Sequence, residues 1–70
     1  MKRHEFVARN LKAEMTRRGI GASEMANQMD LSLSTFYRRL RKPQEFTLGN
    51  IDKAAAFLGL PVETLLKKGA

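Results

Sequence analysis

Residues 21–42 read GASEMANQMDLSLSTFYRRLRK, and the spacing of their apolar residues predicts two short helices joined by a tight turn. The residues expected on the buried sides of these helices are Met25, Ala26, Met29, Thr35, Phe36 and Leu40. The second helix should end near Lys42, because Pro43 lacks an amide proton and restricts the residue before it. Ala26 is small enough for a close helix crossing, and we expect Leu31 to be buried in the turn. The segment therefore has a helix-turn-helix layout.

Four pairs of apolar residues are spaced five apart, and each pair brackets a predicted helix start. The pairs are Ile20 with Met25, Leu31 with Phe36, Phe46 with Ile51, and Leu60 with Leu65. This is the spacing of the hydrophobic staple, which places N-caps at Gly21, Ser32, Thr47 and Pro61. Ser32 and Thr47 have good side-chain acceptors and Gly21 is adequate, with Glu24 three residues on, whereas Pro61 offers no acceptor.

The rest of the chain also has helical periodicity, and no stretch is typical of a strand. Val7, Leu11 and Met15 form the apolar stripe of a first helix over residues 3–18, which Gly19 ends. A fourth helix runs to Leu58, and a short fifth follows around residues 62–66. The fold class expected is therefore all-α, a compact five-helix domain spanning residues 1–70.

The composition excludes several function classes. The chain of 70 residues has no cysteine and a single histidine, so thiolate metal sites and a cysteine nucleophile are excluded. Its carboxylates are scattered without a spacing typical of acid–base pairs. We expect no catalytic site, no metal, no cofactor and no small-molecule ligand. The lack of cysteine and of a long apolar stretch favours the cytoplasm over a membrane or the cell exterior.

The charge favours a polyanionic partner. Thirteen lysines and arginines against seven acids give a formal net charge of +6, and residues 33–42 carry four of these cations and no acid. The side of this helix expected to face solvent offers Leu33, Ser34, Tyr37, Arg38 and Arg41. Such residues can read base edges, and a helix fits the major groove of B-DNA. The alternative is a solvated basic face whose arginines complement the helix dipole.

Residues 11–66 resemble the lambda-repressor-like helix-turn-helix family, the Xre and Cro type of phage and bacterial regulators. The resemblance is carried by LKAEM at 11–15, RGI at 18–20, EMA at 24–26, MDLS at 29–32, STFYRRL at 34–40 and residues 51–60. It implies a sequence-specific, double-stranded DNA-binding regulator of the nucleoid. Because no second domain is expected, the closest type is a Cro-like repressor, which binds a pseudo-palindrome as a homodimer.

The resemblance also implies the site residues. The base-contacting residues would be Leu33, Ser34, Tyr37 and Arg38, and the phosphate-contacting residues would be Ser23, Arg41, Lys42 and Asn50. Arg39 occupies a usually apolar position, so we expect its stem to lie along the surface and its head to lie near a phosphate. The dimer surface would lie after Leu58.

The chain departs from the family at three places. Ala22 stands where the family often has a glutamine, so one contact to a phosphate or to a neighbouring residue is absent. Asp30 stands where the family has its turn glycine, and aspartate tolerates the left-handed conformation better than most residues. Met15 and Leu40 stand where many members carry a buried Arg and Glu pair. An apolar pair can replace such a pair without loss of stability.

Two other functions fit the same composition. An antitoxin or antirepressor would keep the scaffold and bind a protein through the same face. A basic RNA-binding bundle is a weaker alternative, because Tyr37 is the only aromatic residue expected to be exposed for base stacking.

Overall fold

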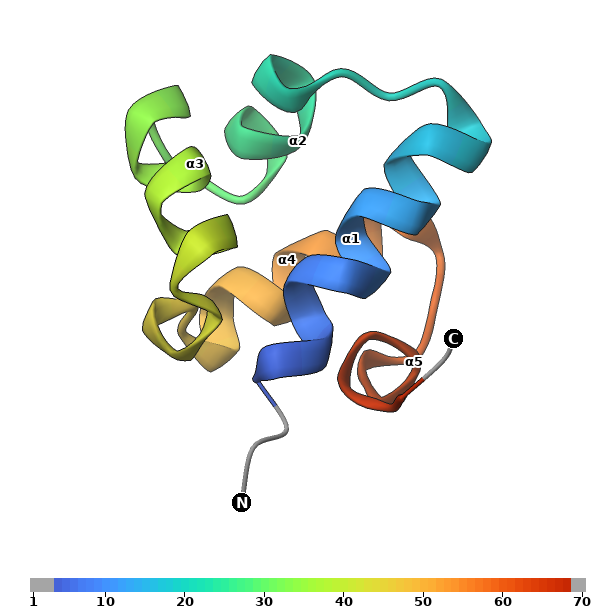
Figure 1. Ribbon diagram of the computed structural model, residues 1–70. Helices are drawn as coiled ribbons and strands as arrows, with labels where there is room; N and C mark the ends of the chain where they lie inside the picture. Colours follow the sequence, from blue (N-terminus) through green and yellow to red (C-terminus); the bar gives the residue numbers. More distant parts are fainter. Residues whose placement is uncertain (1–3, 69–70) are drawn as a thin grey trace.

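The computed structural model describes residues 4–68 of the chain, and this part contains helices and no strand (Figure 1). The helices are α1 (Glu5–Arg18), α2 (Ala22–Gln28), α3 (Leu33–Arg41), α4 (Leu48–Leu58) and α5 (Val62–Leu66), with a 3-10 turn η1 (Pro43–Glu45) between α3 and α4. None of the described helices is long and apolar enough to cross a membrane. The predicted all-α, five-helix fold is confirmed.

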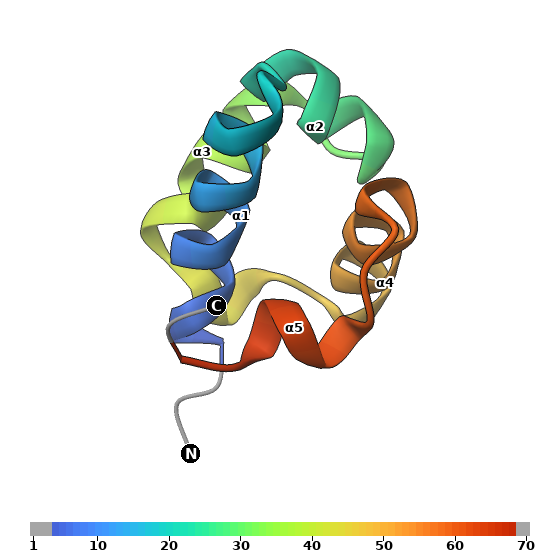
Figure 2. The ribbon, with the colours of Figure 1, turned by 90° about the vertical axis from the view of Figure 1, so that its right-hand side faces the viewer.

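The helices enclose a single apolar interior. Helix α1 packs on α5 and α3, α2 packs on α3 and α4, and α4 packs on α5. In Figure 2, α1 and α3 lie on one side of the molecule and α4 on the other, with α2 at the top and α5 at the bottom. In Figure 1, α3 and α5 lie on opposite sides of α1, so the exposed side of α3 is remote from α5.

The predicted N-caps are all confirmed. Gly21, Ser32, Thr47 and Pro61 each precede the first residue of a helix. Ser32 and Thr47 accept hydrogen bonds from backbone N–H groups of the first turn, whereas Pro61 makes no side-chain cap. The predicted start of α1 at Arg3 lies outside the described residues, and within them the helix begins at Glu5.

The core is built from the predicted apolar stripes. Its buried members are Val7, Leu11, Met25, Ala26, Met29, Phe36, Phe46, Ile51, Ala54, Ala55, Leu58 and Leu65. Leu31 was expected to be buried in the turn, but it is only half-buried. Met15 and Leu40, the apolar replacements for an ion pair, are also half-buried, and all three pack against the core.

The turn between α2 and α3 depends on Asp30. This residue has φ 60°, in the left-handed region that favours glycine and tolerates aspartate. Its conformation lets the Leu31 N–H donate to the Ala26 carbonyl at 2.9 Å, which closes the end of α2. The Asp30 carboxylate also pairs with Lys53 of α4 at 2.9 Å, an exposed ion pair that adds little stability.

Two buried polar residues were not anticipated from the sequence. Asn10 is 2% exposed, and its Nδ2 donates to the carbonyls of Leu65 and Lys67 at 2.8 Å each, with Thr64 at 3.3 Å. These carbonyls lie at the end of α5 and have no partner within that helix, so Asn10 satisfies them and ties α5 to α1.

Glu14 is the second buried polar residue, at 4% exposed. Its carboxylate accepts from Arg17 at 2.7 Å and from Arg18 at 3.0 Å. Arg18 also donates to the Leu58 carbonyl at 2.7 Å. The resulting network joins the end of α1 to the end of α4 and leaves the buried carboxylate charge compensated.

We expect Asn10→Ala to lower the free energy of unfolding by about 1–3 kcal/mol, because it leaves carbonyls at the end of α5 without a donor. Urea unfolding followed by circular dichroism measures this loss. Asn27→Ala is the matched control, since Asn27 is exposed on α2. Equal losses in the two variants would contradict the role given to Asn10.

Candidate nucleic-acid interface

Helix α3 is held to the domain by a narrow buried stripe. Phe36 is its one fully buried residue, and Thr35, Arg39 and Leu40 are half-buried. The Ser32 Oγ accepts from the Thr35 N–H at 3.2 Å, which fixes the start of the helix. Most of the surface of α3 is therefore left to solvent.

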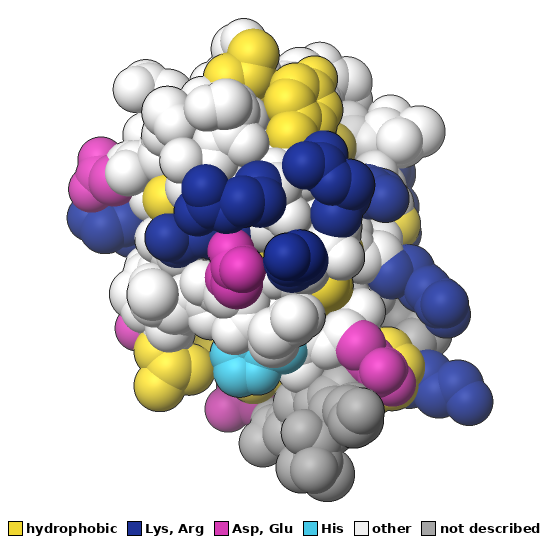
Figure 3. Space-filling view, turned by 60° about the vertical axis from the view of Figure 1, so that its left-hand side comes forward, with side chains coloured by type: hydrophobic (Ala, Val, Ile, Leu, Met, Phe, Trp, Pro, Cys, Tyr) yellow, Lys and Arg dark blue, Asp and Glu magenta, His cyan; other side chains and the backbone are white. Residues whose placement is uncertain are grey.

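The four predicted base-contacting residues all lie on the exposed surface of α3. Leu33 is 40% exposed and Tyr37 is 47% exposed, and Ser34 and Arg38 are exposed as well. In Figure 3, basic side chains form a band across this side of the molecule, with large apolar side chains beside the band. The structure thus brings these residues together on one accessible face.

Arg38 is not free on this face. Its Nε donates to Oε1 of Glu45 at 3.1 Å, across seven residues of sequence. Helix α3 carries no acid, as its sequence shows, but η1 brings this carboxylate alongside it. Residues 33–42 contain no acid, as the sequence shows, but the exposed face that they form includes the carboxylate of Glu45.

Two of the predicted phosphate-contacting residues are bonded to each other. Arg39 donates through Nη1 to Oδ1 of Asn50 at 2.7 Å. The same Oδ1 accepts from the Thr47 N–H at 3.0 Å, and the Asn50 N–H donates to Thr47 Oγ1 at 3.0 Å, which completes a capping box at the start of α4. Asn50 Nδ2 also reaches the Met29 carbonyl at 3.4 Å. Asn50 therefore joins the end of α2, α3 and α4.

The environment of Arg39 differs from the one expected for a surface cation. The residue is half-buried, and its Nε is buried with no hydrogen-bond partner among the described residues. Its head lies at the N-terminus of α4, where backbone N–H groups also point. An anion at this end of α4 would be attracted both by the Arg39 guanidinium group and by the backbone N–H groups of the first turn of α4.

The remaining predicted phosphate-contacting residues are exposed. Ser23 lies in the first turn of α2, Arg41 ends α3, and Lys42 is its C-cap. One exposed residue was missed: Leu48, the first residue of α4, is 66% exposed. Leu48 follows the N-cap Thr47 directly, and the apolar spacing of the sequence does not show that its side chain is exposed.

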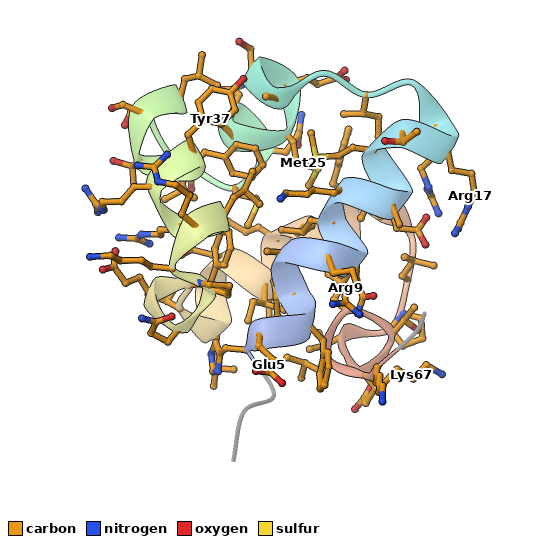
Figure 4. All side chains as sticks on the ribbon, viewed as in Figure 1. Glu5, Arg9, Arg17, Met25, Tyr37 and Lys67 are labelled. Atoms are coloured by element: carbon orange, nitrogen blue, oxygen red, sulfur yellow. The ribbon has the colours of Figure 1, made fainter. Side chains whose placement is uncertain are left out.

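Positive charge is not confined to α3. Figure 4 shows Arg9, Arg17 and Lys67 on the side of the molecule away from α3, around α1 and α5. Arg17 is engaged by Glu14 at 2.7 Å. What distinguishes the α3 face is the combination of several cations with the exposed side chains of Leu33 and Tyr37.

A family model described as the BetR domain matches residues 2–70. The chain belongs to the BetR domain family. This family is helix-turn-helix-like, in agreement with the arrangement of α2 and α3, and it points to a small regulatory domain of DNA-binding type. No curated protein and no solved structure matches this BetR domain.

We expect Asn50→Ala to lower the free energy of unfolding by about 1–2 kcal/mol, because it removes the capping-box acceptor and the partner of Arg39. Asn50→Asp is the matched control, since it keeps an oxygen that can accept from both the Thr47 N–H and Arg39. Thermal unfolding of the two variants measures the difference. A loss as large in Asn50→Asp as in Asn50→Ala would argue against the role given to this oxygen.

Proposed function

We propose that this BetR domain is a sequence-specific regulator of transcription that inserts α3 into the major groove of double-stranded DNA. The observation that carries the proposal is the exposed surface of α3, where Arg38, Arg41 and Lys42 follow exposed Leu33 and Tyr37 along the helix. An α-helix of this kind can enter the groove side-on, and arginine and leucine can contact guanine and the thymine methyl group.

The surroundings of α3 support this docking mode. The turn at Asp30 and the capped start at Ser32 hold the helix in one orientation. Ser23 at the start of α2 and the Arg39–Asn50 pair at the start of α4 lie on the neighbouring elements, where phosphates that flank the groove would be bound. Phosphate contacts would fix the register, and the residues of α3 would read the bases.

The finer role we propose is that of a Cro-like repressor that occludes promoter DNA. Residues 34–40 are among the segments that carry the resemblance to the Xre and Cro regulators. Such proteins bind pseudo-palindromes as homodimers, with half-sites about one helical turn apart. Leu60, Val62 and Leu66 are half-buried around α5 and would supply apolar surface for a dimer on DNA.

Two substitutions separate base reading from phosphate binding. Arg38→Ala should cost about 1–3 kcal/mol of binding free energy and relax the base preference, because a base-edge contact is lost. Lys42→Ala should weaken binding to all sequences alike and reduce the slope of log affinity against log salt by about one. Selection from a random duplex library, followed by gel-shift titration over a salt series, measures both effects.

Equal effects of the two substitutions on base preference would contradict the assignment of roles. Affinity that does not change with salt would contradict the proposed electrostatic contribution of the α3 face. Urea unfolding of each variant provides the control for a loss of fold.

A second candidate function is a protein-interaction module of the antitoxin or antirepressor type. The observation that favours it is the exposure of three large apolar side chains, Leu33, Tyr37 and Leu48. Affinity capture after nuclease treatment distinguishes the two functions: a protein retained without nucleic acid favours the interaction module. We rank it second because the same helix that exposes Leu33 and Tyr37 also carries Arg38 and Arg41, which would meet no opposite charge on an apolar partner.

A further inference from the structure

The Arg38–Glu45 ion pair lies at the centre of the face proposed to bind DNA. An acid is unfavourable at such a place, because it repels the phosphates that the surrounding cations attract. The two side chains are 50% and 37% exposed, so the pair adds little to the stability of the fold. Its position calls for a role other than stability.

Backbone hydrogen bonds of Glu45 and of the next residue hold Glu45 in place. The Glu45 N–H donates to the Lys42 carbonyl at 2.9 Å, and the next residue, Phe46, donates to the Pro43 carbonyl at 3.0 Å. Phe46 is 2% exposed, and its ring packs edge-on against Phe36 of α3 with the centroids 6.5 Å apart. The carboxylate therefore stands on a short turn that is anchored to α3 itself.

The contact engages one edge of the guanidinium group. Arginine has five N–H donors in a planar fork, and within the described part of the chain Arg38 bonds to Glu45 through Nε alone. The two Nη groups are left to donate elsewhere. Paired Nη groups match the O6 and N7 acceptors of guanine.

We propose that Glu45 is a positioning residue that sets the base preference of this domain. It holds the Nε edge of Arg38, which directs the two Nη groups toward a guanine edge and restrains the arginine from swinging to a phosphate. Its charge also weakens the attraction of non-specific DNA to the same face. The inference rests on the proposed function, because it concerns how α3 reads a duplex.

Three variants of the full chain test this role. Glu45→Ala removes the acceptor and the charge, Glu45→Gln keeps an acceptor oxygen without the charge, and Glu5→Gln removes a charge from exposed Glu5 on α1. Gel-shift titration compares binding to the duplex selected by the wild type, to the same duplex with its guanines replaced one at a time, and to random duplex.

In Glu45→Ala, we expect discrimination at one guanine position to fall about tenfold, the size of a bidentate base contact. Its binding to random duplex should strengthen, and its salt slope should steepen by about one unit because Arg38 is free to bind a phosphate. Glu45→Gln should keep most of the guanine discrimination while binding random duplex more tightly. Glu5→Gln should leave guanine discrimination unchanged.

Guanine discrimination in Glu45→Ala equal to that of the wild type would overturn the inference and leave the proposed function intact. A wild type that binds no duplex at any salt concentration would overturn both. The pair itself is tested without DNA from the NMR signal of the Arg38 Nε–H group, which should shift in Glu45→Ala and not in Glu5→Gln. A signal unchanged in Glu45→Ala would also overturn the inference.

Discussion

The burial of Phe36 is the contact on which the presentation of α3 depends. A helix of nine residues is not stable alone in water, and only Phe36 among its residues is fully buried. Burying a side chain of this size contributes about 1.5–3 kcal/mol. The ring also meets Phe46, so the same contact fixes η1 beside the helix. Because so little of α3 is used for packing, most of its surface remains available to a partner.

The parts of the fold that were predicted from the sequence are those set by short-range rules. The staple pairs and caps involve residues within five positions of each other, and the four predicted caps all begin helices. The left-handed conformation of Asp30 was implied by the resemblance instead, because Asp30 stands where the family has its turn glycine. The exposure of Leu33, Ser34, Tyr37 and Arg38 followed from the position of Phe36 on α3.

The contacts that were missed depend on residues distant in sequence or on an irregular turn. Asn10 bonds to carbonyls 54 to 57 positions away, and no local pattern distinguishes it from a surface asparagine. Arg38 and Glu45 meet only because η1 reverses the chain after Pro43. The sequence predicted that the head of Arg39 lies near a phosphate but not its bond to Asn50, which depends on how α3 packs beside the start of α4.

These missed contacts change how the face can work. Arg38 and Arg39 are each held by a side chain from another element, Glu45 and Asn50, before any DNA is present. Side chains that are already oriented lose less entropy on binding, which favours recognition of one geometry over another. In a helix-turn-helix-like domain of the BetR family, such restraint would turn general attraction for a polyanion into preference for particular bases.

Residue-by-residue NMR of the labelled protein, titrated with duplex DNA, tests the docking of α3 most directly. We expect the largest shift changes at Leu33, Ser34, Tyr37 and Arg38, with smaller ones at Ser23 and Asn50 and none at Glu5 on α1. Changes that concentrate on α5 and the outer side of α1, with α3 unaffected, would contradict the placement of this helix in the groove.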